Sequence, residues 1–183
     1  MSVNPKSITL RHATPDDQPF LLSVYAATRG DLNLANLDDI QRQALIEMQF
    51  TARQQQYKLA YPQASCSVIL EDTTAIGSMT VNRGEHDIVL VDIALLPEHR
   101  NRGVGAGLVK TLQQEAAIAG KRVCLHVLVT SPAVRFYERL GFSNAGDGGA
   151  YLSMDWHSQS QARNEFVRES QLSFADGISE QRR

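Results

Sequence analysis

The chain has 183 residues, of which 43% are hydrophobic and 21% charged, a balance typical of one soluble domain with a sizeable core. Its formal charge of -2 offers no overall basic field for nucleic acid or an anionic membrane surface. The sequence contains no signal-peptide core and no run of about eighteen apolar residues, and Cys66 and Cys124 form neither a CxxC pair nor a disulfide framework. We therefore expect a cytoplasmic protein that acts on small molecules or a peptide.

The N-terminal part of the chain predicts a short strand followed by two helices. "ITLRHA" alternates apolar and polar residues as a strand does, and Thr14 and Pro15 then supply an N-cap and a first helical position. After a loop at residues 29–31, a longer helical pattern runs from about 37 to 60 and ends before Pro62. The first helix directs four apolar side chains inward: Phe20, Leu21, Val24 and Tyr25.

The middle of the chain predicts an antiparallel meander. Residues 66–97 contain β-branched runs that are interrupted at "EDTT" and "NRGEHD", which indicates three strands. The third strand leads directly into "HRNRGVGAG", residues 99–107, and a helical pattern then continues to Gly120. The predicted order is therefore strand, glycine-rich loop and helix.

The C-terminal part predicts a strand, a helix and a final strand. "RVCLHVLV" reads as a buried strand, and "AYLSMDW" as the last one. Between them, "SPAVRFYERLGF" predicts a helix with Ser131 as N-cap, Pro132 at its first position and Gly141 at its end. This order favours an α/β or mixed α+β domain over residues 7–157, followed by a polar tail or interaction segment at 158–183.

The glycine-rich loop predicts an anion site. A helix that begins near Gly103 directs its unpaired N–H groups and positive dipole end outward, and the glycines at 103, 105 and 107 let a phosphate approach the backbone. Arg100 and Arg102 would add charge-assisted hydrogen bonds. The pattern does not match a dinucleotide fingerprint, which needs glycine where Leu108 stands, or a Walker motif. The alternative is that the glycines serve tight helix packing.

Two motifs together resemble the GNAT superfamily of N-acetyltransferases. One is Arg100-Asn101-Arg102-Gly103-Val104-Gly105, which fits the family's cofactor motif, and the other is the aromatic helix "SPAVRFYERLGF". The likeness extends from about Ser7 to Trp156. It implies a mostly antiparallel twisted sheet with helices on both faces and acetyl-CoA as acyl donor. The strands "VLVDIALL" and "CLHVLV" would be the family's splayed parallel pair, with a bulge as the device that separates them.

The resemblance also implies a set of cofactor contacts. The pyrophosphate would lie on the amides of residues 102–105, with a contribution from Ala106, and amides near Leu95 and Leu96 would pair with the pantetheine arm. Many members carry an asparagine shortly before the second motif helix, where this chain has Thr130-Ser131-Pro132. Either a hydroxyl takes that contact, or Ser131 is only the N-cap of the helix. Including the tyrosine of that helix, the expected cofactor residues are Leu95, Leu96, Arg100, Asn101, Arg102, Gly103, Val104, Gly105, Ala106, Ser131 and Tyr137.

Two residues are the candidates for proton transfer. Tyr137 aligns with the tyrosine that many family members use as general acid; alternatively it is a core residue whose hydroxyl only bonds the cofactor sulfur. Asp92 is the first candidate base, because a charge inside "VLVDIALL" is costly to bury without a task or a partner such as arginine. His126 is the second. No His, Cys and Asp spacing indicates a metal, and neither cysteine is placed to suggest an acyl-enzyme.

The family's acceptor site is usually walled by the first two helices and their connection. Asp31, Asp38, Asp39 and Glu47 would attract a cationic amine, whereas Arg29, Arg53, Tyr57 and Tyr61 would hold a carboxylate or aromatic group. The acceptor class therefore stays open among amino acids, polyamines, antibiotic amines and peptide N-termini.

The sequence thus predicts an N-acetyltransferase that moves an acetyl group from acetyl-CoA to a primary amine by direct attack. The alternatives are a non-catalytic acyl-CoA-binding sensor or interaction module and, more distantly, a nucleotide enzyme whose glycine loop holds ATP. A homodimer is a further expectation from the family.

Overall fold

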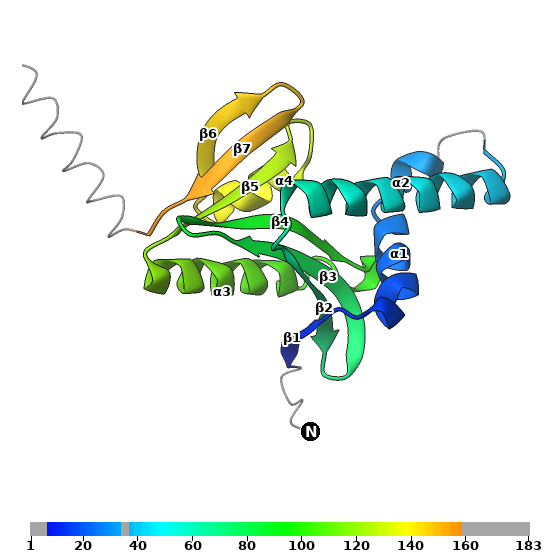
Figure 1. Ribbon diagram of the computed structural model, residues 1–183, viewed down its shortest axis with the longest axis horizontal. Coiled ribbons are helices and arrows are strands. Elements are labelled where there is room, and N and C mark those ends of the chain that lie inside the picture. Colours follow the sequence, from blue (N-terminus) through cyan, green and yellow to red (C-terminus); the bar gives the residue numbers. More distant parts are fainter. Residues whose placement is uncertain (1–6, 34–36, 159–183) are drawn as a thin grey trace, which may run out of the picture. The chain divides into compact units, whose positions relative to one another are not determined.

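The computed structural model describes residues 7–33 and 37–158, which form seven strands and four α-helices (Figure 1). The chain divides into two units, residues 1–109 and residues 110–183. The predicted polar tail lies outside the described residues except for its first residue, Ser158.

Four antiparallel strands organise the first unit. They pair in chain order as β1 (Ile8–His12), β2 (Ser65–Glu71), β3 (Thr74–Arg83) and β4 (Asp87–Leu95). The predicted meander is therefore confirmed, including both of its interruptions. Its buried side chains are mainly β-branched or unbranched apolar residues, including Val68, Ile69, Ile76, Met79, Val81, Ile88 and Leu90.

Strand β4 bulges in the middle. Val81 lies opposite Leu90 and Thr80 lies opposite Asp92, so Val91 is an extra residue without a partner in the register. A bulge bends its strand and redirects the side chains that follow. The predicted bulge is thus present, and it lies immediately before Asp92.

The first helix begins where the sequence indicates. Thr14 is the N-cap of a 3-10 turn, η1 (Pro15–Asp17), which continues into α1 (Gln18–Ala26). The Asp17 carboxylate accepts hydrogen bonds from Nη2 and Nη1 of Arg11 at 2.7 and 3.0 Å and from the Thr14 N–H at 2.7 Å. These hydrogen bonds, the one from Arg11 first, hold the pKa of Asp17 well below its usual range.

Helix α2 (Asp39–Ala60) packs on α1 through an apolar cluster (Figure 1). Asp38 caps it by accepting the Gln41 N–H at 2.8 Å. The 3-10 turn η2 (Gly30–Asn33) lies in the connection between the two helices. The cluster consists of Leu21, Tyr25, Leu32, Ile46 and Phe50, with Phe20 partly buried beside them. Because α1 also contacts β3 and β4, the two helices form a wall beside the sheet.

The connection from β4 to the third helix contains the glycine-rich loop. A 3-10 turn, η3 (Pro97–His99), precedes the loop, and α3 (Val104–Ala119) follows it. The helix ends at Gly120, whose φ of +66° is the left-handed conformation of a helix stop. The predicted order of strand, loop and helix is confirmed, whereas η3 was not expected.

Three antiparallel strands and one helix organise the second unit. Strands β5 (Arg122–Leu128), β6 (Ser143–Gly148) and β7 (Tyr151–Trp156) pair in the order β5, β7, β6. Strand β6 was missed because "SNAGDG" has little β propensity, and pairing with β7 overrides that composition. The core includes Val123, Leu125, Val127, Tyr137, Phe142 and Met154.

Helix α4 (Ala133–Arg139) starts one residue later than predicted. Its N-cap is Pro132, not Ser131, although the Ser131 hydroxyl still accepts the Ala133 N–H at 3.2 Å. The difference follows from Pro132 itself, whose fixed φ and helical ψ place it at the boundary. Gly141, with φ of +85°, follows the helix as expected.

Candidate cofactor loop and acceptor cavity

The backbone of the glycine-rich loop is shaped to present N–H groups. Asn101 and Gly103 both have left-handed φ angles, +57° and +82°. The first hydrogen bond inside α3 runs from the Gly107 N–H to the Gly103 carbonyl at 2.9 Å. The three preceding amides, of Val104, Gly105 and Ala106, therefore come before the first intrahelical bond and are directed out of the helix end. Such an end attracts an anion.

Close packing does not explain why glycine stands at positions 103 and 107 of the loop. A Cβ at Gly103 or at Gly107 would meet no heavy atom within 4 Å. Gly103 is required by its backbone angle, because other residues are strained at that φ. Gly107 has no such requirement, so the open space before it is consistent with close approach of a ligand.

The Arg100 side chain is used differently from the prediction. Its Nε donates to the Leu95 carbonyl at 2.8 Å and its Nη2 donates to the Ala27 carbonyl at 3.0 Å. Leu95 is the last residue of β4, and Ala27 is the C-cap of α1. Arg100 therefore ties the loop to its own unit instead of reaching outward as a phosphate ligand.

Arg102 is also anchored by the protein. Its Nη2 donates to Glu71 Oε1 at 3.0 Å, and Nη1 lies 3.3 Å from His99 Nδ1. His99 Nδ1 in turn lies 3.6 Å from Glu71 Oε2. The Glu71 side chain is only 7% exposed, so a buried carboxylate holds one side of the loop. Glu71 is not part of any sequence motif, and it reaches the loop only because it lies at the end of β2.

The two predicted pantetheine contacts, the N–H groups of Leu95 and Leu96, point in opposite directions at the end of β4. Leu95 lies opposite Gly77, and the Leu96 N–H donates to the Ile76 carbonyl at 2.9 Å. Hydrogen bonds alternate along an antiparallel pair, so the Leu95 N–H faces away from β3. The Leu96 amide is therefore used by β3 and the Leu95 amide faces away from that strand, and the pantetheine contacts of both residues stay predictions.

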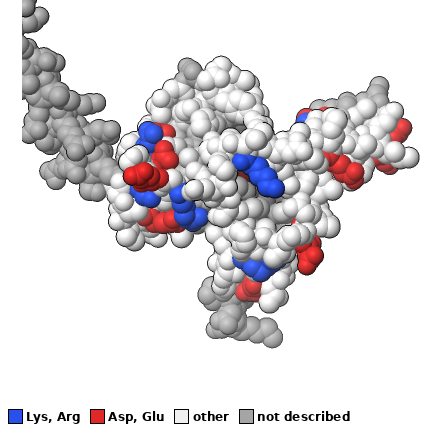
Figure 2. Space-filling view, in the orientation of Figure 1, with Lys and Arg blue, Asp and Glu red and all other residues white. Residues whose placement is uncertain are grey.

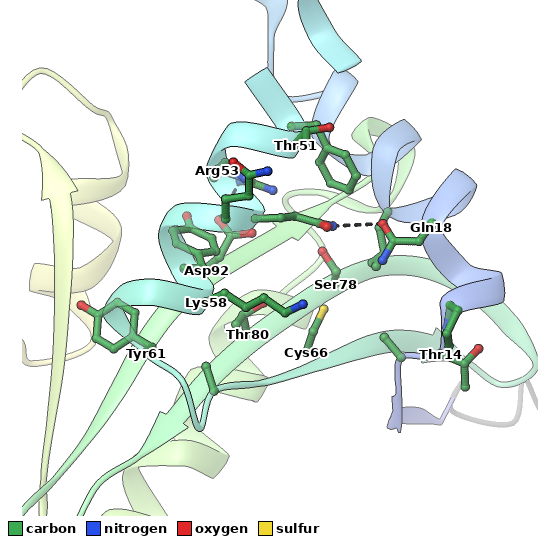
Figure 3. A pocket seen from close by; sticks show the side chains of 18 of the residues that line it. Thr14, Gln18, Thr51, Arg53, Lys58, Tyr61, Cys66, Ser78, Thr80 and Asp92 are labelled. Atoms are coloured by element: carbon green, nitrogen blue, oxygen red, sulfur yellow. Dashed lines mark hydrogen bonds and ion pairs between the residues drawn. The ribbon is translucent and has the colours of Figure 1, made fainter. Parts of the chain in front are cut away.

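A cavity of about 610 Å³ lies in the first unit beside α2 (Figure 3). Its floor comes from β2, β3 and β4, through Cys66, Ser78, Thr80 and Asp92. Helix α2 forms one wall, and the turn that leads into α1 forms the other. This volume is in the range of small-molecule sites, roughly 300–1,000 Å³.

Asp92 is the acidic group of this cavity. Its carboxylate lies 3.3 Å from Arg53 Nη1, so the arginine pairing that was the alternative to a catalytic role is present. Burial nevertheless raises the pKa of Asp92, and the Arg53 charge opposes this only in part. A carboxylate with a raised pKa in a cavity is a stronger base than an exposed one.

Cys66 lines the same cavity as a thiol. Burial raises its pKa, and a hydrogen bond to Thr80 lowers it to a smaller extent. A raised pKa leaves less of the reactive thiolate at neutral pH. Cys66 is therefore not an activated nucleophile.

The remaining predicted residues lie in the second unit. Tyr137 is a buried residue of α4, and its ring meets Phe136 and Phe142 edge-on at centroid distances of 5.0 and 5.6 Å. Ser131 lies just before that helix. His126 is exposed on β5.

The acidic candidates for the acceptor site lie away from the cavity. Asp38 caps α2, Asp39 pairs with Arg42 at 2.7 Å, and Asp31 pairs with Arg29 at 2.6 Å. Glu47 accepts a hydrogen bond from a neighbouring glutamine of α2 at 2.7 Å. Figure 2 shows acidic side chains gathered over the first part of α2, while both signs are interspersed elsewhere on that face.

The basic and aromatic candidates divide differently. Three of them line the cavity at intervals of four residues: Arg53 and Tyr57 in α2, and Tyr61 directly after it. Arg29 does not line it. Lys58, which the sequence reading did not single out, lines it too.

Among residues 7–33 and 37–158, no group of three or more His, Cys, Asp or Glu side chains is arranged to hold a metal ion. Within the same ranges, no helix has the length and apolar character needed to span a membrane.

Comparison with known proteins gives a family and a fold. Residues 62–144 match the family model of the acetyltransferase (GNAT) domain. A search of curated proteins gave no match. The structure resembles the PaiA N-acetyltransferase of Thermoplasma acidophilum, solved with coenzyme A, at 17% identity over 83% of this chain and 99% of that chain, with a TM-score of 0.64.

Other solved acetyltransferases have a similar fold. An acetyltransferase of Thermus thermophilus shares 20% identity over 83% of this chain and 97% of its own, with a TM-score of 0.62. A GNAT family acetyltransferase of Elizabethkingia anophelis, solved with acetyl-CoA bound, shares 14% over 82% and 98%, with a TM-score of 0.54. The predicted α+β fold class is thereby confirmed: the fold is that of the GNAT acetyltransferases, and the GNAT domain model matches residues 62–144.

Proposed function

We propose that the protein is an N-acetyltransferase that moves the acetyl group of acetyl-CoA to a primary amine of a small molecule. The observation that carries the proposal is that β4 links both parts of the chemistry. Asp92 lines the cavity, and β4 ends three residues later, after about 10 Å of extended chain. The turn η3 and the glycine-rich loop then lead to the helix that presents its amides.

The loop has the features that a pyrophosphate needs. The amides of residues 104–106 supply donors, the helix end supplies partial positive charge, and Gly103 and Gly107 leave open space. Relatives of this fold were solved with coenzyme A and with acetyl-CoA, which supports the same ligand class here. Bound acetyl-CoA supplies a thioester-activated acetyl group.

Asp92 acts as the base that prepares the acceptor. An amine is mostly protonated at neutral pH, and only its neutral form has the lone pair that attacks a carbonyl carbon. The Asp92 carboxylate takes a proton from the ammonium group. Its raised pKa brings it closer to that of the amine, which makes this transfer less unfavourable.

Tyr137 acts as the acid at the other end of the reaction. As the nitrogen–carbon bond forms, the carbon–sulfur bond breaks and sulfur departs with its electron pair. The Tyr137 hydroxyl donates a proton to that sulfur and is reprotonated from solvent, while the acylated nitrogen releases its extra proton to solvent. The products are an N-acetylated amine and a free thiol.

Transfer is direct, without an acyl-enzyme. Cys66 is the thiol of the cavity, and its raised pKa opposes the thiolate that a covalent mechanism needs. A direct mechanism predicts that both substrates are bound before either product leaves.

Calorimetric titration with acetyl-CoA tests the first step. We expect micromolar binding by the native chain and loss of binding in Gly103→Glu, which places a side chain and a negative charge at the helix end. Gly149→Glu is the matched control, because Gly149 also has a left-handed φ of +75° and open space but lies between β6 and β7. Equal binding by all three proteins would place the pyrophosphate elsewhere.

Turnover on an amine panel tests the second step. Acetylation that slows in Tyr137→Phe without loss of acetyl-CoA binding supports the proposal. Acetyl-CoA binding with no acetylation of any amine would favour the acyl-CoA sensor, and tight binding of ATP but not acetyl-CoA would favour a nucleotide enzyme.

A further inference from the structure

The charges around the cavity are unbalanced in favour of basic groups. Among the described residues that line it, Asp92 is the one acidic side chain, whereas Arg53 and Lys58 are basic. A diamine or polyamine would therefore meet two cations for each carboxylate. The cavity is better suited to an acceptor that brings a negative charge together with its amine.

Arg53 is held in a fixed orientation with unused hydrogen-bonding capacity. Its guanidinium lies 4.4 Å from the centroid of the Tyr25 ring and 5.5 Å from that of Tyr57. Its hydrogen bond to Asp92 runs from Nη1 and is long, at 3.3 Å, and the side chain lines the cavity. A guanidinium that aromatic rings orient in this way can donate hydrogen bonds to a second carboxylate.

Lys58 adds a movable positive charge at the mouth of the cavity. It is an exposed residue of α2, and Figure 3 shows its side chain extending into the cavity. Its ammonium group can reach a carboxylate without a fixed geometry. The nearby rings of Phe50, Tyr57 and Tyr61 provide apolar surface for the remainder of a small molecule.

We propose that the acceptor is an amino acid, whose amine faces Asp92 while its own carboxylate is bound by Arg53 and Lys58. This inference rests on the proposed function and narrows it to one substrate class. In an α-amino acid the two charged groups are attached to one carbon. The molecule can therefore set its opposite charges against the Arg53–Asp92 pair, whose charged atoms are 3.3 Å apart. An amine without a carboxylate offers no negative charge to Lys58 and no second carboxylate to Arg53.

Matched pairs of acceptors provide the first test. Alanine, leucine, phenylalanine and lysine are compared with ethylamine, isoamylamine, phenethylamine and cadaverine, which differ by loss of the carboxylate. Rates are expressed per unprotonated amine, because the carboxylate also changes the amine pKa. We expect kcat/KM to be about 10- to 100-fold higher for the best amino acid than for its partner. Equal values within every pair would overturn the inference while leaving acetyl transfer intact.

Variants of α2 identify the groups responsible. Lys58→Gln and Arg53→Gln should reduce the preference for the amino acid at least several-fold, and Lys58→Gln should do so through KM with little change in kcat. Arg42→Gln is the control, because Arg42 is a basic residue of α2 that does not line the cavity. Lys58 is exposed, so its variant remains informative if Arg53→Gln does not fold. A preference that survives both cavity substitutions would overturn the assignment.

A binding measurement separates this inference from the proposed function. N-acetylphenylalanine and N-acetylleucine are titrated against the matching acetamides without a carboxylate. The acids should bind about tenfold or more tightly, and Lys58→Gln should remove the difference. Equal or absent binding of the acids overturns the inference. Tighter binding of the acids with no acetylation of any amine would instead refute the proposed function and leave carboxylate recognition in place.

Discussion

Replacement of Gly107 by alanine should make the protein more stable and bind acetyl-CoA less tightly. Gly107 lies in the first turn of α3, and a Cβ built there would meet no heavy atom within 4 Å. Alanine is a better helix former than glycine by up to about 1 kcal/mol, mostly because glycine loses more backbone entropy on folding. With no clash to offset that gain, we expect the free energy of unfolding to rise by about 0.5–1 kcal/mol.

The effect on binding has the opposite sign. If a pyrophosphate occupies the open space, the added methyl group displaces it from the loop amides. Loss of one charge-assisted hydrogen bond corresponds to about 1.5–3 kcal/mol, or roughly a 10- to 100-fold increase in Kd. Thermal unfolding without ligand should show a rise in Tm of about 1–4 °C for a chain of this length. Calorimetric titration measures the Kd of the same preparation.

Gly103→Ala is the matched comparison. Its Cβ would also stand in open space, but the φ of +82° costs a non-glycine residue about 1–2 kcal/mol. Both variants should therefore bind acetyl-CoA less tightly, while their stabilities move in opposite directions. Unchanged acetyl-CoA affinity in Gly107→Ala would refute the reasoning, because it would mean that the open space does not receive the ligand.

Four further substitutions test other parts of the structure. Because burial raises the pKa of Asp92, kcat/KM should increase with pH through a limb above the ordinary aspartate range, and a pH–rate profile of Asp92→Asn should lack that limb. Tyr137→Phe should lower kcat about 100-fold or more without a matching change in the acetyl-CoA Kd measured by calorimetry; an unaltered kcat would exclude it as the acid. Glu71→Gln should lower the free energy of unfolding by about 1–3 kcal/mol, since it weakens the buried partner of Arg102, and denaturant titration measures the loss. The pKa of Asp17 is lowered by its hydrogen bonds, so the stability it provides is present above the ordinary aspartate pKa and lost as pH falls through the folded value. Asp17→Asn should therefore be less stable than the native chain at neutral pH, and acid titration should close the gap.

Local signals in the sequence predicted most of the elements. The Thr14-Pro15 start, the long pattern up to Pro62 and the interruptions of the meander act over a few residues, and each appears at its expected place. Strand β6 is the exception, because its backbone pairs with β7 despite glycine at Gly146 with φ of +152°. Its existence depends on a neighbouring strand, which no local propensity can indicate.

The candidate site shows the same division. A carboxylate in an apolar strand correctly drew attention to Asp92, since burial of a charge needs a reason. Its partner Arg53 is 39 residues away in sequence and meets it only because α2 packs beside the sheet. The roles of the motif arginines are hard to predict for a related reason. Their sequence position shows that they are near the loop, but not whether they donate to a ligand or to the protein's own carbonyls and carboxylates.

Arg100 connects the glycine-rich loop to two other elements of the first unit. Its guanidinium joins the Leu95 carbonyl at the end of β4 to the Ala27 carbonyl at the end of α1. Residues of α1 line the cavity, and the amides that follow Gly103 are directed out of the end of α3. One side chain therefore fixes the loop against the strand that carries Asp92 and against the helix that walls the cavity. If the protein transfers acetyl groups as proposed, the amine and the thioester must be held within bonding reach, and Arg100 would serve that need by fixing this geometry rather than by binding phosphate.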